Sequence, residues 1–499
     1  MAKKSKAAQP NIIKRPPIVV VMGHIDHGKS TLLDYLRKSN VVNDEAGGIT
    51  QHLSAYVVPH TTKDGAQENI TFLDTPGHAA FQKMRLRGAD VADVAILVVS
   101  AEDGVKPQTL EALESIKQAG IPYIVAINKV DKPSADIPKT QASLIENEIY
   151  IEGMGGDIPW APISALKGDG VSDLLDLVVL TADLQEITGD TAAAASGKVI
   201  EGLMDQRRGN TATLIITNGT LKSGQFVVAD DAYAPVRIME DASGKAIKEA
   251  SLSEPVGIVG FTSIPAAGTD FYVVESKKAA ELAIVSQHAP TANTHVKSKL
   301  PTIPVLLKAD ALGSLEAIEH ELEKFESDRI CVRIIDQAVG PVSESDVQNV
   351  SATKDAIIVG FNVTVARGAA DLAERLHVEI DTFNIIYELS DWLNTALKNR
   401  TPKQEEKVVT GSAKVIKHFS TQKYTHVLGG RVETGELKRG QSVRILRRDI
   451  DLGKGVVKNL QQQKSDVDRV VDSEFGMQID SRIEIAGGDV LEAYDIVIT

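Results

Sequence analysis

The stretch Gly23-His24-Ile25-Asp26-His27-Gly28-Lys29-Ser30 decides the fold of the first part of the chain. It fits the phosphate-loop pattern G-x-x-x-x-G-K-[ST], whose glycines let backbone N–H groups point at phosphate oxygens. Lys29 would place a positive charge beside the β and γ phosphates, and the Ser30 hydroxyl would ligate Mg²⁺. Ser30 and Thr31 open a helix whose positive end favours anions. The apolar run 18–22 and the helical pattern 30–37 supply the strand and the helix that this motif needs.

Two further motifs are predicted to face the phosphates. Asp74-Thr75-Pro76-Gly77 follows an apolar strand, and Gly47-Gly48-Ile49-Thr50 lies between the first helix and that strand. We expect Asp74 to approach the metal through a water molecule and the Gly77 N–H to contact the γ phosphate. Thr50 could ligate Mg²⁺ only while the γ phosphate is present, which predicts a switch segment. For this segment alone, a flexible loop with an incidental threonine is the alternative.

Residues that follow two later strands predict which nucleotide base the protein binds. Asn128-Lys129-Val130-Asp131 comes after the apolar run 123–127, and an Asp131 carboxylate can accept from both N1–H and the 2-amino group of guanine. Adenine offers no such pair of donors, so the motif selects guanine. Ser164-Ala165-Leu166 would complete the pocket with backbone N–H groups that face the guanine O6.

Together these motifs predict a GTPase with GTP or GDP and Mg²⁺ as cofactors. His78 directly follows the Asp74 motif, so we expect it to orient the attacking water; a solvated surface histidine is the alternative. Phosphoryl transfer needs positioning and charge neutralisation rather than a covalent intermediate, which suits Lys29, Mg²⁺ and His78. No residue is an evident arginine finger, so intrinsic hydrolysis should be slow.

The rest of the chain predicts a multidomain α/β plus β protein. Its 499 residues are enough for three or four domains. Strand–helix alternation predicts a mostly parallel sheet, and short strands with frequent turns predict a barrel. The predicted parts are a basic disordered tail (1–14), a P-loop GTPase domain (15–184), a β-barrel (198–275), a polar connector (276–300), an α/β sandwich domain (300–383), a long helix (384–402) that Pro402 should stop, and a C-terminal β-barrel (407–499) with a turn at Gly429-Gly430.

Composition excludes several classes of protein. The single cysteine, Cys331, allows neither an intrachain disulfide nor a four-cysteine zinc site. No apolar stretch approaches the roughly 20 residues of a membrane span, and no apolar core follows the N-terminal lysines, so we expect a cytoplasmic protein without a secretory signal. The net charge of −14 argues against a general nucleic-acid coat protein, although residues 407–458 hold twelve Lys/Arg against four Asp/Glu.

These motifs resemble the GTPase domain of translation factors, since small signalling GTPases usually have glutamine in place of His78. Within that group the chain is similar to the bacterial translation initiation factor two family, from about residue 15 to the C-terminus. The resemblance rests on the stretches at 21–29 (VMGHIDHGK), 45–52 (EAGGITQH), 74–81 (DTPGHAAF), 305–317 (VLLKADALGSLEA), 358–363 (IVGFNV) and 488–494 (GDVLEAY).

The resemblance implies a translation initiation factor. It would place formylmethionyl initiator tRNA on the small ribosomal subunit, promote joining of the large subunit, and hydrolyse GTP when the ribosome triggers it, before release. Ribosomal RNA would fix His78, with Ile25 and Ile49 flanking it as an apolar gate, and the protein would be a monomer off the ribosome. The family's fold has β-barrels as its second and fourth domains.

The chain departs from the family in two places. It lacks the long N-terminal region that many bacterial members carry. In the last domain a basic-basic-aromatic triplet, a Glu-Cys-Gly triplet and an earlier cysteine are replaced by Gln461-Gln462-Gln463, by Glu474-Phe475-Gly476 and by Gly430. Candidate tRNA contacts are these residues with basic ones such as Arg431 and Arg444, and a solvated barrel surface is the alternative for any single one.

Two other functions stay open at this point. An elongation-type tRNA-carrying GTPase would have a β-barrel as its third domain, whereas residues 304–383 predict strands alternating with helices. A non-hydrolysing ribosome- or RNA-binding assembly protein would use nucleotide only as structure, and the presence of His78 argues against it.

Overall fold

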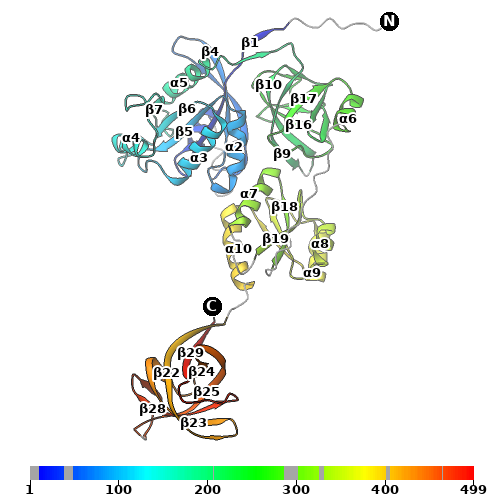
Figure 1. Cartoon of the computed structure of the whole chain (residues 1–499). Coiled ribbons are helices and arrows are strands. Elements are labelled where there is room, and N and C mark those ends of the chain that lie inside the picture. The colour runs from blue at the N-terminus through cyan, green and yellow to red at the C-terminus, as the bar shows by residue number, and fades with distance from the viewer. Residues whose placement is uncertain are drawn as a thin grey trace. The chain divides into compact units, whose positions relative to one another are not determined.

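The computed structural model describes residues 10–38, 49–205, 207–285, 302–324, 331–400, 405–463 and 465–498. The chain divides into two compact units, Met1–Asn399 and Arg400–Thr499 (Figure 1). The first nine residues of the predicted tail, Gly47 and Gly48 of the predicted switch, residues 286–300 of the predicted connector, and Pro402 lie outside the described residues. None of the described helices is long and apolar enough to cross a membrane.

A six-stranded sheet with helices on both faces forms the first part of unit one. Its order is β3-β4-β2-β5-β6-β7, and only β3 runs antiparallel to its neighbour. The strands are β2 (Ile18–Gly23), β3 (Ser54–Thr61), β4 (Gln67–Asp74), β5 (Val94–Ser100), β6 (Tyr123–Asn128) and β7 (Trp160–Pro162). The helices are α1 (Lys29–Arg37), α2 (Gln82–Val91), α3 (Pro107–Ala119), α4 (Ile137–Glu146) and α5 (Val171–Asp183).

Because helices cover both faces of the sheet, its central strands are continuous apolar runs. Ile18, Val20 and Met22 of β2 pack with α2, α3 and α4, whereas Val19 and Val21 pack with α1 and α5. A central parallel strand must therefore be apolar on both sides, as β2 and β5 are. The loops that leave β2, β4, β6 and β7 start at the carboxyl edge of the sheet, where ligands of such sheets bind.

The N-terminal segment differs from the predicted disordered tail. Residues Ile12–Lys14 form strand β1, which pairs antiparallel with β8 (Thr188–Asp190). Lys14 also lies 3.0 Å from Glu68 of β4 and 2.7 Å from Asp183 of α5, so ion pairs hold this segment to the first domain. Its polar, basic sequence suggested disorder because the partner strand lies more than 170 residues away in the chain.

A buried ion pair next to β1 offers a test of stability. The Arg15 guanidinium binds Asp93 and donates to Ser253 of the following domain at 3.0 Å, and the side chains of Arg15 and Asp93 are only 9% and 11% exposed. Arg15→Ala should lower the free energy of unfolding of unit one by about 3 kcal/mol, because Asp93 would stay buried without its cation. Urea denaturation measures this, with Lys14→Ala as a surface control expected to cost less than about 1 kcal/mol. Equal losses would contradict the argument.

The second domain is an antiparallel sheet of seven strands around one apolar core. The order is β13-β12-β17-β9-β10-β16-β14, with a separate pair β11-β15. The strands are β9 (Ser196–Asp205), β10 (Gly209–Asn218), β11 (Leu221–Lys222), β12 (Phe226–Ala229), β13 (Ala232–Pro235), β14 (Met239–Glu240), β15 (Glu249–Ala250), β16 (Pro255–Val259) and β17 (Asp270–Val274). Helix α6 (Lys277–Val285) follows. The predicted polar connector is therefore wrong over 277–285, where alanines favour helix and Ala280 is buried.

The third domain is a sandwich of helices around a parallel sheet of order β19-β18-β20-β21. Val305 and Leu307 of β18 pack with α7 and α10, whereas Leu306 packs with α8 and α9. This confirms the α/β prediction. The elements are β18 (Thr302–Ala309), α7 (Leu312–Glu323), β19 (Cys331–Val339), α8 (Glu344–Ser351), β20 (Ile357–Phe361), α9 (Arg367–Leu376), β21 (Glu379–Phe383) and α10 (Ile386–Arg400).

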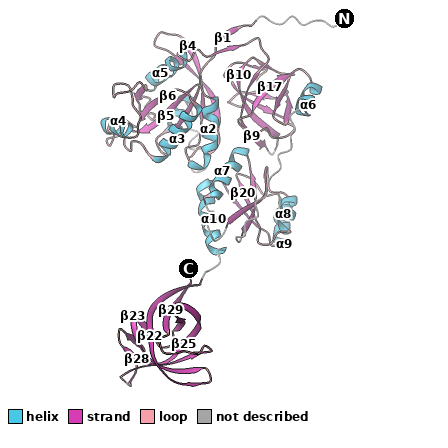
Figure 2. Cartoon of the chain, in the orientation of Figure 1, coloured by secondary structure: helices cyan, strands magenta, loops and turns pink. Residues whose placement is uncertain are grey.

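Unit two is a β-barrel built almost entirely of strands (Figure 2). Its strands run in the order β22-β29-β24-β25-β28-β23-β27, and β22 also pairs with β23, which closes the barrel. The strands are β22 (Glu405–Gln422), β23 (Thr425–Lys438), β24 (Ser442–Arg447), β25 (Ile450–Gln462), β26 (Ser465–Asp466), β27 (Arg469–Val471), β28 (Glu474–Ser481) and β29 (Val490–Ile498).

The predicted turn at Gly429-Gly430 is wrong, because both residues lie inside β23. A Cβ on Gly430 would lie 2.4 Å from the Lys414 carbonyl oxygen of the neighbouring strand. This glycine therefore permits a close approach of two backbones within the sheet, which is a common reason for glycine inside a strand.

Candidate functional site

The phosphate loop joins β2 to α1 at the carboxyl edge of the first sheet. Asp26 and Gly28 have positive φ angles of 63° and 88°. A Cβ on Gly28 would lie 2.3 Å from Asn128 Nδ2, so only glycine fits there. Gly28 is the N-cap of α1 and places no side chain over its first turn. The N–H groups at the start of α1 are therefore available to an anion such as phosphate.

Lys29 is held at the centre of this loop. Its side chain is buried, and its amine donates to the carbonyl oxygens of Gly23 at 2.9 Å and of His24 at 2.8 Å. Burial lowers the pKa of Lys29 to about 8, although the charge of Asp74 acts in the opposite direction. A phosphate beside this amine would supply the negative charge that the two neutral carbonyls lack.

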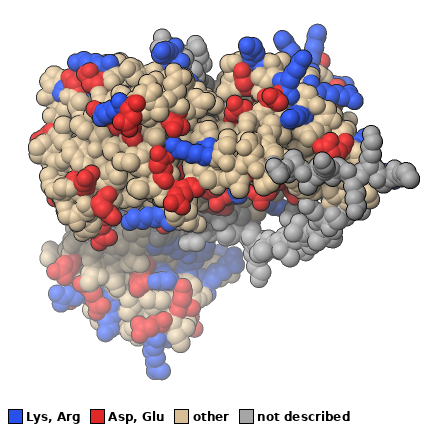
Figure 3. All heavy atoms as spheres, turned by 90° about the horizontal axis from the view of Figure 1, so that it is seen from above, with Lys and Arg blue, Asp and Glu red and all other residues tan. Residues whose placement is uncertain are grey.

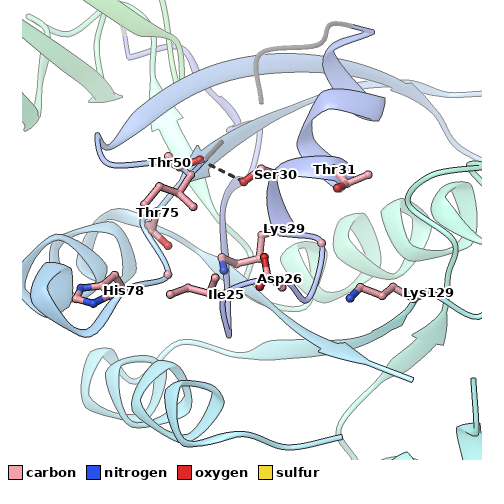
Figure 4. A pocket seen from close by; sticks show the side chains of 12 residues that line it. Ile25, Asp26, Lys29, Ser30, Thr31, Thr50, Thr75, His78 and Lys129 are labelled. Carbon is pink, nitrogen blue, oxygen red and sulfur yellow. Dashed lines mark hydrogen bonds between the residues drawn. The ribbon is translucent and has the colours of Figure 1, made fainter. Parts of the chain in front are cut away.

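Three oxygen donors meet where a metal ion is predicted. Ser30 Oγ lies 3.2 Å from Thr50 Oγ1 (Figure 4). Thr50 Oγ1 in turn donates to Asp74 Oδ2 at 3.4 Å. The three residues come from α1, from the end of the predicted switch and from the end of β4. Hydroxyl and carboxylate oxygens are the ligands that Mg²⁺ prefers, so this donor set fits that ion.

The guanine motifs are joined to each other and to the phosphate loop. Asn128 Oδ1 accepts from the Ala165 N–H at 2.9 Å, and Asn128 Nδ2 donates to the His27 carbonyl at 2.9 Å. The Ser164 hydroxyl donates to Asp131 Oδ1 at 2.7 Å, and this hydrogen bond lowers the pKa of Asp131. Asp131 is therefore an ionised acceptor at neutral pH. Because Ala165 donates to Asn128, its N–H is not turned towards a base in this structure.

The predicted residues gather around two neighbouring pockets that share Thr31. The first, of about 210 Å³, is lined by Ile25, Asp26, Gly28, Lys29, Ser30, Thr31, Ile49, Thr50, Thr75, Gly77, His78 and Lys129. The second, of about 730 Å³, is lined in part by Thr31, Ala165 and Leu166. The remaining predicted residues line neither pocket: Gly23, His24, His27, Asp74, Pro76, Asn128, Asp131 and Ser164.

His78 lies at the rim of the smaller pocket with its ring turned outwards. Figure 4 shows the imidazole directed away from Lys29, with Ile25 between the two. Its Nδ1 accepts from the Ala80 N–H at 3.1 Å, which caps the short 3-10 helix Ala79–Phe81. Burial lowers the pKa of His78. To reach a water molecule at the γ phosphate, the ring would have to rotate past Ile25.

Comparison with known proteins decides the family. Three family models match the chain: "Elongation factor Tu GTP binding domain" over residues 14–183, "Elongation factor G domain 2" over 194–274 and "Translation-initiation factor 2" over 277–394. Translation initiation factor IF-2 of Clostridium perfringens is 39% identical over 509 residues, which cover 99% of this chain and 74% of that protein. The chain belongs to the translation initiation factor IF-2 family.

Two further proteins are similar to this chain. Translation initiation factor IF-2 of Clostridium novyi is 39% identical and covers 96% of this chain and 72% of that protein. A solved structure of GDP-bound aIF5B from Aeropyrum pernix is 27% identical, covers 96% of this chain and 92% of that chain, and has a TM-score of 0.49. The predicted family is thus confirmed by the curated relatives. This IF-2 family member is a translation initiation GTPase that binds GTP and GDP and hydrolyses GTP.

Sequence reasoning missed several residues that shape this IF-2 family site. The buried Arg85 guanidinium donates to the carbonyls of Pro76 and His78 and lies 3.0 Å from Glu111. Gln108 accepts from the Ile25 N–H at 3.1 Å. An arginine within a helix usually indicates a solvated face, so only the three-dimensional arrangement could have shown that Arg85 holds the backbone on both sides of Gly77.

His52 ties the predicted switch to two other domains of this IF-2 family member. Its Nδ1 lies 3.4 Å from Glu201 of β9, and its Nε2 lies 3.3 Å from Asp310, which follows β18. Burial opposes a charge on His52, but the hydrogen bonds to Asp310 and Glu201 outweigh it and raise its pKa well above 6.5. The imidazole is therefore protonated at neutral pH and joins two carboxylates.

This junction predicts a pH dependence of stability. Below about pH 6.5 both the folded and the unfolded forms bind the His52 proton, so the contribution of the junction is complete. As pH rises above 6.5 the unfolded chain releases the proton while the folded chain keeps it, and the contribution falls until the raised folded pKa is passed. Urea denaturation of wild type and His52→Gln from pH 6 to 9 should show their stability difference shrinking with pH. A difference that grows would contradict the junction.

The C-terminal barrel of this IF-2 family member contains a pocket of about 480 Å³. Strand register brings its parts together, since Gly430 lies opposite Phe475 and Gln461 opposite Gly476. The pocket is lined by Ile416, Lys417, Phe419, Gly429, Gly430, Gln461, Gln463, Glu474, Phe475 and Gly476. Of the predicted tRNA contacts, Arg431, Arg444 and Gln462 do not line it; Arg444 binds Glu492, and Gln462 donates to Ser473 at 2.9 Å.

Gly430 lies close to the ring of Phe475 in this pocket. A Cβ on Gly430 would lie 2.7 Å from the Phe475 ring, so a side chain at 430 and a phenylalanine at 475 exclude each other. Phe475 is buried in the barrel core. The glycine therefore leaves room for the Phe475 ring, which lines the pocket.

Proposed function

We propose that this translation initiation GTPase binds initiator formylmethionyl-tRNA through the C-terminal pocket, places it on the small ribosomal subunit, and promotes joining of the large subunit. The observation that carries the proposal is the convergence of β22, β23 and β28 with Gln461 and Gln463 around one pocket with an exposed aromatic side chain, Phe419, at its rim. Cytoplasmic ribosomes would trigger GTP hydrolysis and thereby release the protein.

The nucleotide roles follow from the first site. Lys29 and the N–H groups of the phosphate loop would hold the β and γ phosphates, and Asp131 would select guanine. Ser30 and Thr50 would hold Mg²⁺, which neutralises phosphate charge when bound. Thr50 of the predicted switch would ligate Mg²⁺ only with the γ phosphate present, and the Gly77 N–H would contact that phosphate. Loss of the γ phosphate would therefore release both the predicted switch and the segment that carries Gly77 and His78.

The chemistry of the barrel pocket suits a formylated amino acid. Formylation turns the charged α-amino group into a neutral amide, and the amides of Gln461 and Gln463 can donate to and accept from such a group. Glu474 can accept from its N–H. Ile416 and Phe475 line the pocket and supply apolar surface for the methionine side chain.

The surroundings of the pocket suit the end of an RNA. Phe419 is 60% exposed, so an unpaired base can stack on it. Lys414, Lys417 and Arg431 are exposed on β22 and β23, whereas Arg447 is neutralised by Asp489 at 2.8 Å. On the face of the molecule drawn in Figure 3, Lys and Arg are interspersed with Asp and Glu. We expect a few local phosphate contacts from the exposed basic side chains of the barrel.

The test is binding of the full chain with GTP to formylmethionyl-tRNA and to methionyl-tRNA across a salt series. We expect the formylated form to bind more tightly at every salt concentration. Phe419→Ala should weaken its binding by about 5- to 100-fold, as removal of a base-stacking partner does. Tyr424→Ala is the matched control, because Tyr424 is 62% exposed on the same barrel but does not line the pocket. Equal affinities that fall steeply with salt would contradict the proposal.

The elongation-type alternative is not favoured. Its third domain would be a β-barrel, and β18 to β21 with α7 to α10 form an α/β domain instead.

A further inference from the structure

We propose that Tyr387 and Glu321 of the third domain are positioning residues for His78, which they hold outside the phosphate pocket in the free protein. The inference rests on the proposed role of His78 in orienting water. Tyr387 belongs to α10 and Glu321 to α7, so two helices of the third domain would set the position of a side chain that belongs to the first.

The His78 ring packs against both residues. Its centroid lies 4.6 Å from that of Tyr387, and the rings are nearly perpendicular, with an interplanar angle of 87°. His78 Nδ1 lies 4.0 Å from Glu321 Oε1, and the side chain of His78 is only 14% exposed. The edge-to-face ring pair is attractive, and the Glu321 carboxylate attracts the ring whenever the ring is protonated, so these contacts stabilise the outward position.

The Glu321 carboxylate has partners of its own. The Glu321 side chain is 5% exposed, accepts from the Ser390 hydroxyl at 2.8 Å and pairs with Lys324 at 2.5 Å. Ser390 follows Tyr387 by three residues on α10, so both belong to one face of that helix. The Glu321 carboxylate is therefore held by Ser390 of α10 and by Lys324, in contacts that do not involve His78.

The segment that carries His78 is also embedded in the third domain. Ala80, Phe81 and Met84 belong to the same apolar cluster as Leu315 of α7 and Ile386 of α10. Gln51, next to Thr50, donates to the Asn384 carbonyl at 2.9 Å and accepts from the Ile386 N–H at 3.2 Å. The residue next to the predicted switch and the segment that carries His78 thus both contact the start of α10, and a shift of this helix would weaken the contacts that hold His78.

The expected effect is a change in population. If His78 can orient water only when its ring leaves Tyr387 and Glu321, the competent fraction of the free protein is reduced by the stability of those contacts. Removing both contacts should raise GTP hydrolysis by the free protein about three- to tenfold. The rate with saturating ribosomes should change by less than about twofold, because the ribosome would already supply the competent arrangement.

The test is single-turnover GTP hydrolysis by the full chain without ribosomes. Tyr387→Ala with Glu321→Gln should show the rise, Tyr387→Phe should keep the wild-type rate because it keeps the ring, and Glu323→Gln controls for loss of one carboxylate on α7, since Glu323 is exposed. Unchanged GDP affinity and unfolding midpoint would verify that the variants fold. A wild-type rate in the double variant overturns the proposal.

A readout independent of activity is the NMR titration of His78 in protein with labelled histidine. Glu321 raises the pKa of His78, whereas burial, Lys324, Arg85 and His320 lower it. Glu321→Gln should therefore lower this pKa further, and Tyr387→Ala should shift the ring resonances; no change in either overturns the proposal. His78→Ala separates the two hypotheses. If it leaves ribosome-stimulated hydrolysis unchanged, the proposed role of His78 fails, whereas a loss together with an unresponsive double variant refutes only the positioning.

Discussion

Replacement of His78 by alanine should lower ribosome-stimulated GTP hydrolysis by about 10²- to 10⁴-fold while leaving GTP and GDP affinity within about twofold. Affinity should persist because the contacts expected to hold the phosphates come from Lys29 and the phosphate-loop backbone, and His78 lies at the rim of that pocket. The rate should fall because His78 is the only histidine among the described residues that line the pocket.

The measurement is single-turnover hydrolysis on ribosomes, with nucleotide affinity determined separately. His377→Asn is a suitable control, because His377 is an exposed histidine of the third domain whose left-handed backbone (φ 53°) asparagine tolerates. A loss of activity that follows a loss of GTP affinity would show instead that His78 supports the structure of the pocket.

The parts of the site that the sequence could predict are those written in contiguous motifs at strand ends. A buried strand, a glycine-rich turn and a helix suffice to place Gly28, Lys29 and Ser30, because parallel strands end at one edge of the sheet. The α/β and β texture likewise predicted the fold class of each part. Local patterns carry this information since each residue's role depends mainly on its neighbours in the chain.

The features that could not be predicted depend on partners distant in sequence. Tyr387 contacts His78 across more than 300 residues, and neither residue's neighbourhood indicates the other. The same holds for Ile12–Lys14, whose strand pairs with residues 188–190. Gly430 was misread because a glycine pair suggests a turn locally, whereas the reason for it is the backbone of β22 and the ring of Phe475.

Replacement of Asp131 by asparagine should change the base that the protein binds. Asp131 is an ionised acceptor because the Ser164 hydroxyl donates to it at 2.7 Å and lowers its pKa. A carboxylate can accept from both N1–H and the 2-amino group of guanine, whereas an amide offers one acceptor and one donor. Loss of one charged hydrogen bond and the clash of two donors should weaken GTP binding by about 10²- to 10⁴-fold.

The same change should admit xanthosine triphosphate, whose ring has an oxygen where guanine has the 2-amino group. The asparagine NH₂ would donate to that oxygen while its carbonyl accepts from N1–H, so binding and ribosome-stimulated hydrolysis of this nucleotide should appear together. Asn128, which joins the base loop to the phosphate loop through His27 and Ala165, is untouched, so the pocket should keep its shape. Competition against a fluorescent nucleotide measures both affinities.

Ser164→Ala is the control. It removes only the supporting hydroxyl and should weaken GTP binding by less than about tenfold without admitting xanthosine triphosphate. Unchanged GTP affinity in Asp131→Asn would mean that the base is read elsewhere, and the assignment of Ser164, Ala165 and Leu166 to the base pocket would have to be abandoned with it.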